Sequence, residues 1–256
     1  MSERMTWIWK NKKYISCSNI LLNWKISLHE QKISSIIEDD LLYYWTEILS
    51  KVGNTKISPE LIFDLVDEDV KISFDYLVFE KILEFHKEWL LKQNNIHINI
   101  QPFTLTDKNF EQRLESLFNY YNFKDFWNIS FEILENWTIE DIGLLNKNIQ
   151  YLRNKWTKVW LDDYPNSNNN NELLLSLDKL DFVKIDKRFS FSIKNNKKEV
   201  IRDIIQQLVT DIQKFHPGAK IIIEWVEDMF CYDFIKNNIF WIDYVQWYLF
   251  WKPNEI

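Results

Sequence analysis

Short apolar runs alternate along this chain with longer segments in which apolar residues recur at helical spacing. The apolar runs predict strands over residues 20–28, 41–49, 96–100, 127–131, 159–161, 182–183, 219–223 and 239–248. The segments between them predict helices over residues 74–91, 106–121, 138–152, 172–177, 198–215 and 229–237. We expect Ser58 and Pro59 to begin one more helix, and Thr106 or Asp107 and then Thr138 to cap two of the others.

This alternation of strands and helices is typical of the α/β class. Repeated βα units in a chain of 256 residues fit a TIM-like (β/α)8 barrel, and an open doubly wound sheet is the competing architecture. The sequence has no linker rich in Pro, Gly or Ser and no internal repeat, so we expect residues 1–256 to form a single domain.

Aromatic residues are abundant and glycines are scarce, with 13 Trp, 11 Tyr and 18 Phe against 3 Gly. The core is therefore expected to pack large rings rather than small side chains. The sequence contains neither the GxGxxG motif nor the GxxxxGK motif followed by Ser or Thr. Rossmann-type dinucleotide binding and P-loop nucleotide binding are therefore excluded.

The net charge of −7 argues against DNA, RNA or an anionic membrane as partner, but it is compatible with a small anionic ligand bound through metal ions. Cys17 and Cys231 cannot form a disulfide framework and suit a reducing cytosol. The N-terminus lacks the apolar segment of a secretory signal, and the aromatic stretch 240–251 is too short and too polar to span a bilayer. We therefore expect a cytoplasmic protein.

Polar side chains end nearly every predicted strand. In chain order they are Glu47, Asn99, Glu132, Asp162 with Asp163, Lys184, Glu224 and Gln246. A single acid at a strand end is usually a helix cap or a loop residue, but capping does not account for such endings on successive strands. Because the carboxyl ends of parallel barrel strands meet at one rim, we expect these side chains to converge.

Clustered carboxylates cannot all stay ionised without cations. The four histidines, His29, His86, His97 and His216, have no metal-binding or triad spacing, so we expect them to be structural or on the surface. An oxygen-only donor set favours Mg²⁺, Mn²⁺ or Ca²⁺ over zinc. Paired ions would activate a water for phosphoryl displacement, and a lysine beside them would hold that water.

The order of these residues resembles the EAL-domain family of cyclic di-GMP phosphodiesterases over residues 18–253. The motif for which the family is named appears here as Glu47-Ile48-Leu49. The other family motifs resemble Ile57-Ser58-Pro59, Ile98-Asn99-Ile100-Gln101-Pro102, Phe131-Glu132-Ile133-Leu134-Glu135, Leu161-Asp162-Asp163-Tyr164, Lys184-Ile185-Asp186, Glu224-Trp225-Val226-Glu227 and Gln246-Trp247-Tyr248. None of these motifs is specific by itself, whereas their order and spacing together are.

The resemblance implies a (β/α)8-like barrel whose first strand is antiparallel. It implies hydrolysis of cyclic di-GMP to linear pGpG with two Mg²⁺ or Mn²⁺ ions and inhibition by Ca²⁺. This activity would lower the level of the second messenger and so control motility, biofilm formation and adhesion in a bacterium.

The resemblance also implies roles for particular residues. One ion would be held by Glu47, Asn99, Glu132 and Asp162. Asp162 and Asp163 would share the second ion, Lys184 would position the attacking water, and Glu224 would be its base or its partner. The residues expected to contact the substrate or to support the site are Asn23, Lys51, Glu135, Asp186, Trp225, Glu227, Gln246 and Trp247.

The chain departs from the family pattern at several positions. Trp225 and Trp247 replace glycines, Lys51 replaces an arginine, and the loop over residues 164–171 is not Gly-rich. The two indoles could fill space, stack on guanine, or block the site.

The alternative function is therefore a degenerate, inactive EAL protein that acts as a cyclic di-GMP sensor or binds a regulatory protein partner. A different metal-dependent barrel enzyme, such as an enolase-like one, is disfavoured by the order of the motifs. Because oligomers are commonly two-fold, we expect a homodimer.

Overall fold

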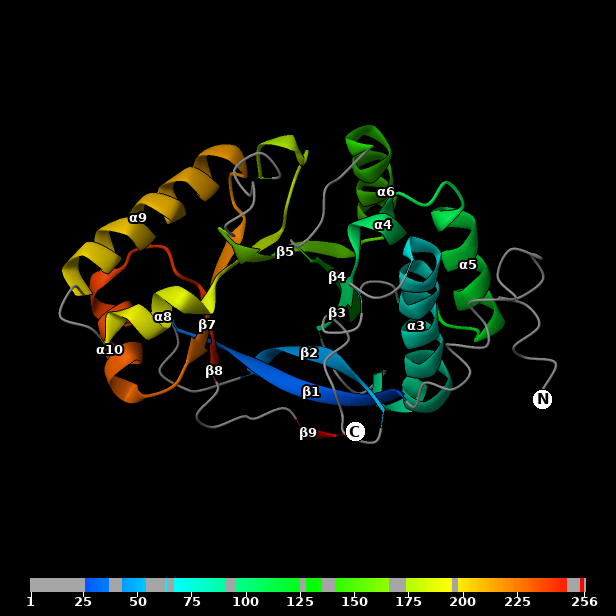
Figure 1. Cartoon of the computed structure of the whole chain (residues 1–256), viewed down its shortest axis with the longest axis horizontal. Helices are drawn as coiled ribbons and strands as arrows, with labels where there is room; N and C mark the ends of the chain where they lie inside the picture. The colour runs from blue at the N-terminus through cyan, green and yellow to red at the C-terminus, as the bar shows by residue number, and fades with distance from the viewer. Residues whose placement is uncertain are drawn as a thin grey trace.

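The computed structural model describes residues 26–36, 43–53, 63, 67–90, 95–124, 128–134, 141–165, 174–194, 198–247 and 254–255. In this part of the chain eight strands form a closed barrel, with helices outside it (Figure 1). The barrel strands are β1 (Ile26–Ser35), β2 (Tyr43–Val52), β3 (Ile96–Ile100), β4 (Ile129–Ile133), β5 (Lys158–Tyr164), β6 (Phe182–Ile185), β7 (Lys220–Val226) and β8 (Tyr244–Trp247). A short strand, β9 (Asn254–Glu255), pairs with β1.

The strands β2 to β8 are parallel and follow one another in chain order around the barrel. Strand β1 closes the barrel, because it pairs antiparallel with both β2 and β8. The prediction of a TIM-like (β/α)8 barrel with an antiparallel first strand is therefore confirmed, and the open doubly wound sheet is wrong. The single-domain extent over residues 1–256 stays a prediction.

The helices lie on the outer face of the barrel. They are α3 (Glu68–Leu90), α4 (Pro102–Leu105), α5 (Phe110–Tyr120), α6 (Ile142–Asn154), α8 (Lys187–Ile193), α9 (Lys198–Phe215) and α10 (Met229–Asn238). Figure 1 shows α3 to α6 on one side of the strands and α8 to α10 on the other. In the described residues, no helix combines the length and the hydrophobicity needed to cross a membrane.

Several predicted boundaries agree with the structure, notably those of β3 and α9, and others differ. The helix predicted over 106–121 corresponds to α5 and begins later, after Asn109. Thr106 instead ends the short helix α4, which was not predicted. The strand predicted over 239–248 is only β8, because a turn at residues 240–241 follows α10. Helix α8 was not predicted. Asp141 caps the N-terminus of α6. The predicted caps Ser58 and Thr138 lie outside the described residues.

Aromatic rings fill the inside of the barrel below its carboxyl-terminal end. One buried cluster inside the barrel consists of Ile33, Trp45, Trp160, Phe182 and Ile222. The ring centroids of Trp45 and Trp160 are 5.0 Å apart in an edge contact, and those of Trp160 and Phe182 are 4.1 Å apart in a stack. Trp45, Trp160, Phe182 and Ile222 each stand two residues before a predicted site residue. Because strand side chains alternate between faces, this cluster forms the floor under the predicted site.

Candidate active site at the mouth of the barrel

The predicted strand-end residues converge around the ammonium group of Lys184 on β6. Its Nζ lies 2.5 Å from Glu132 Oε1, 3.1 Å from Glu224 Oε1, 3.2 Å from Glu47 Oε2 and 3.5 Å from Asp162 Oδ1. These four carboxylates come from β4, β7, β2 and β5 in that order. The Lys184 side chain is 1% exposed and the Glu132 side chain is fully buried, so the cluster is shielded from water.

Glu47 joins two further strands to this cluster. The amide nitrogen of Asn99 on β3 donates to Glu47 Oε1 at 3.3 Å, and that of Gln246 on β8 donates to Glu47 Oε2 at 2.6 Å. Strands β2 to β8 thus each contribute at least one side chain to a single group of interactions. The prediction that these residues converge is borne out by the geometry.

The charges of this cluster do not balance, since one lysine faces four carboxylates. Burial raises the pKa of Glu132 and of Glu224 well above the usual range, and the charge of Asp162 raises both further. Burial would also raise the pKa of Glu47, but the charge of Lys184, the neighbouring His97 and a hydrogen bond from Gln246 lower it below its usual value. The pKa of Lys184 is raised well above its usual value, because the carboxylates around it outweigh its burial.

Two β-bulges shape the rim at the ends of β5 and β7. The pairing of β5 with β6 shifts register between Leu161 and Tyr164, where Asp163 has a φ of 44°. The pairing of β7 with β8 shifts after Ile223, where Trp225 has a φ of 53°. Such bulges change the direction of the side chains that follow them. Burial, and then the charge of Asp162, raises the pKa of Asp163 to about 6, although a hydrogen bond with Glu224 lowers it.

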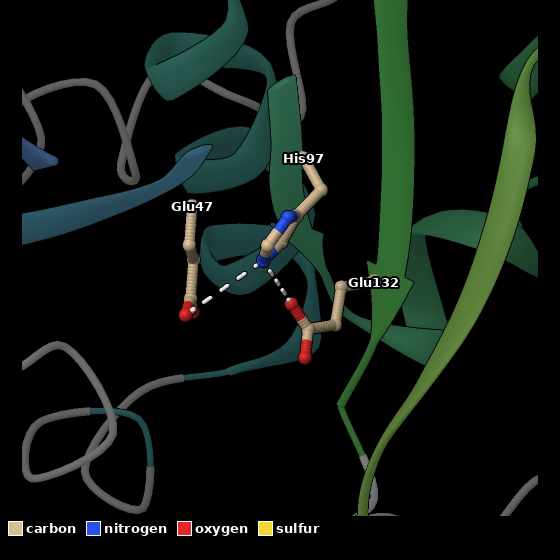
Figure 2. Close-up of side chains that lie close together, drawn as sticks. All are labelled: Glu47, His97 and Glu132. Carbon is tan, nitrogen blue, oxygen red and sulfur yellow. Dashed lines mark ion pairs between the residues drawn. The ribbon is translucent and has the colours of Figure 1, made fainter. Parts of the chain in front are cut away.

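The cluster also contains a buried imidazole that sequence reasoning did not place there. His97 on β3 is buried, and its Nε2 lies 2.9 Å from Glu132 Oε2 and 3.7 Å from Glu47 Oε2 (Figure 2). An imidazole nitrogen therefore lies among the carboxylate oxygens, whereas the sequence indicated only oxygen donors. The available signal was position, since His97 stands two residues before Asn99 and so shares its face of β3.

Other predicted site residues have partners away from the four carboxylates. Asp186 caps α8 and accepts hydrogen bonds from the backbone nitrogen and Nε of Arg188. Glu227 pairs with Lys194 at 2.9 Å. The Trp225 ring lies on α8, with Lys187 Nζ 5.4 Å and the Phe191 ring 6.1 Å from its centre.

The remaining predicted site residues are only partly described. Lys51 lies on β2 four residues after Glu47, on the same face of the strand. Asn23, Glu135 and the side chain of Trp247 lie outside the described part of the chain.

The donor atoms fit divalent cations. Glu132, Asp162 and Glu224 each offer a ligand atom, and these atoms lie within 4.8 Å of one another. The same holds for Glu47, His97 and Glu132. The Oδ1 atom of Asn99 is buried and accepts no hydrogen bond within the described residues, so it is available as another ligand. Positive ions would also balance the excess of carboxylates.

Comparisons with known proteins agree with this geometry. The EAL domain family matches residues 27–253. Over 257 residues the chain is 29% identical to the cyclic di-GMP phosphodiesterase PdeA of Borreliella burgdorferi, covering 96% of this chain but only 36% of that protein. A standalone EAL protein of Vibrio cholerae with bound cyclic di-GMP has a TM-score of 0.74 at 20% identity, covering 91% of this chain and 93% of that one.

A second solved structure, of an EAL domain protein from Listeria monocytogenes, has a TM-score of 0.71 at 23% identity and covers 95% of this chain and 94% of that one. The two structural similarities concern the fold, and the family match extends from the second residue of β1 to beyond the end of β8. This protein belongs to the EAL domain family.

Proposed function

We propose that this protein hydrolyses cyclic di-GMP to linear pGpG at the mouth of its barrel, with two Mg²⁺ or Mn²⁺ ions bound. The observation that carries the proposal is the convergence of four carboxylates from different strands on Lys184 Nζ, all within 3.5 Å. The similarity to a cyclic di-GMP phosphodiesterase and to an EAL structure with cyclic di-GMP bound supports the choice of substrate.

The carboxylates would hold the cations. Glu47, Asn99, Glu132 and Asp162 are the ligands that we propose for one ion, and Asp162 and Asp163 would share the second. When bound, divalent cations supply Lewis acidity and the positive charge that allows an anionic phosphodiester to approach these carboxylates.

Lys184 and Glu224 would carry the proton chemistry. The Lys184 ammonium orients a water toward phosphorus and offsets the negative charge that develops there. Glu224, 3.1 Å from Lys184 Nζ, accepts the proton of that water. A bond forms between the water oxygen and phosphorus, the bond from phosphorus to the 3′ oxygen breaks, and that oxygen takes up a proton. The product is linear pGpG with a 5′ phosphate.

A turnover assay with cyclic di-GMP tests this proposal. We expect pGpG to appear on chromatography with Mn²⁺ or Mg²⁺ and to disappear with EDTA or in Glu132→Gln. The matched control is Glu111→Gln, which removes an exposed carboxylate paired with Lys147 and should keep full activity. Absence of pGpG from folded protein with either metal would overturn the proposal. Binding of cyclic di-GMP without turnover would then favour the sensor function.

A further inference from the structure

Aromatic packing holds His97 in place beneath the carboxylates that surround Lys184. Its side chain is fully buried on β3, and its ring stacks on Trp160 with centroids 4.2 Å apart and an interplanar angle of 25°. Trp160 is itself fixed by its stack on Phe182. The floor of aromatic rings therefore fixes the direction in which the imidazole nitrogen points.

The imidazole faces two carboxylates without making a hydrogen bond. Figure 2 shows Nε2 of His97 directed toward Glu47 and Glu132. The distances of 3.7 Å and 2.9 Å are short, but within the described residues neither ring nitrogen has a partner in hydrogen-bond geometry. An unsatisfied polar group is costly at such a buried position. A cation bound by all three side chains would remove this cost at Nε2.

We propose that His97 Nε2 is a ligand of the cation held by Glu47 and Glu132, and that it makes the site prefer Mn²⁺ to Mg²⁺. The proposal rests on the metal-dependent function proposed above. The three ligand atoms lie within 4.8 Å of one another, close enough to bind one ion. Mg²⁺ favours oxygen ligands and retained waters, whereas imidazole is a good ligand for transition metals. A nitrogen ligand therefore distinguishes the two ions.

The test is electron spin-echo spectroscopy of the protein loaded with Mn²⁺ alone. A coordinated imidazole couples its nitrogen to the Mn²⁺ electron spin, and we expect this modulation in the wild type and its loss in His97→Ser. The matched control is His29→Gln, which removes another buried histidine, whose ring is within 3.1 Å of Ser27 Oγ, and should keep the modulation. Protein containing ¹⁵N-histidine should show the ¹⁵N pattern, so the answer does not depend on a variant that folds.

Calorimetry gives a second measurement. In His97→Ser we expect the affinity for Mn²⁺ to fall by about 10-fold or more, with little change in the affinity for Mg²⁺. Bound Mn²⁺ without nitrogen modulation in the wild type would overturn the proposal, and so would equal losses for both metals. Modulation without hydrolysis of cyclic di-GMP would leave this proposal standing and reject the proposed function, so the two failures are distinguishable.

Discussion

Lys184 dominates the electrostatics of the barrel mouth, because its single positive charge faces four buried or half-buried carboxylates. Removal of one member of a buried ion pair leaves its partners uncompensated. We therefore expect Lys184→Gln to lower the free energy of unfolding by about 3 kcal/mol in metal-free protein, measured by urea unfolding. Saturating Mn²⁺ should recover most of this loss, because the cations replace the missing charge.

The same substitution should lower turnover of cyclic di-GMP by about 100-fold, since Lys184 orients the water and offsets charge in the transition state. The matched control for the stability measurement is Lys147→Gln. This substitution breaks an exposed pair with Glu111 and should change the free energy of unfolding by less than about 1 kcal/mol. Stability of Lys184→Gln equal to that of the control would contradict the central role of this ion pair.

At the scale of single residues, the acids and the lysine could be predicted because each directly follows an apolar run. His97 could not be recognised in the same way, because its partners Glu47 and Glu132 are far away in the sequence and no spacing links them. The register of β3 contains the only signal, since residues 97 and 99 share a face. Asp186 and Glu227 were predicted to support the site, but they contact Arg188 and Lys194 instead. These contacts depend on the position of α8, which was not predicted.

At the scale of elements, Asp75 ties helix α3 to the segment that follows β3. Its buried carboxylate accepts hydrogen bonds from the backbone nitrogen of Gln101 at 2.9 Å and from Thr104 Oγ1 at 2.6 Å. Burial raises the pKa of Asp75 from 3.8 to about 7, although these hydrogen bonds lower it. The two hydrogen bonds to Asp75 fix the residues that directly follow β3, the strand that carries Asn99 and His97.

The raised pKa of Asp75 predicts a pH dependence of stability. The folded state binds this proton more tightly than the unfolded state, so the contribution is complete below about pH 4 and is lost as the pH rises through about 7. Relative to Asp75→Asn, which cannot titrate, the wild type should lose up to about 1.4 kcal/mol of unfolding free energy per pH unit in this window. Parallel stability curves for the two proteins between pH 4 and pH 7 would contradict this interpretation.

The bulge in β7 predicts a difference between two small residues at position 225. Trp225 has a φ of 53°, a conformation that glycine adopts without the steric cost of a Cβ atom. Trp225→Gly and Trp225→Ala both lose the indole contacts with Lys187 and Phe191, but only glycine escapes the backbone cost. In urea unfolding, the glycine variant should be about 1 kcal/mol more stable than the alanine variant. An alanine variant of equal or greater stability would show that the backbone changes there.

At the scale of the whole molecule, the site exists only because the barrel closes. Strands β2 to β8 supply the cluster, and β1 joins the two ends of this series by pairing with β2 and β8. The regular alternation of strands and helices was enough to predict an α/β fold. The closure of the barrel could not be derived from this alternation, because the pairing of β1 with β8 joins the two ends of the chain. Only the resemblance to a family indicated an antiparallel first strand.

Because the ligands come from strands all around the barrel, cation binding should stabilise the whole fold. We expect the thermal unfolding midpoint to rise with Mn²⁺ concentration, by an amount equivalent to about 2.7 kcal/mol at 100 times the dissociation constant. EDTA should reverse this rise, and Glu132→Gln should weaken it. A midpoint that does not respond to Mn²⁺ would contradict a cation site in the closed barrel.

The central claim is that water attacks phosphorus of cyclic di-GMP at this barrel mouth. It is tested most directly by mass spectrometry of the product formed in H₂¹⁸O with Mn²⁺ present. The predicted result is linear pGpG with one ¹⁸O in its 5′ phosphate from the wild type, and a much lower yield from Lys184→Gln. Unchanged cyclic di-GMP, or a product without ¹⁸O, from folded and metal-loaded wild type would contradict it.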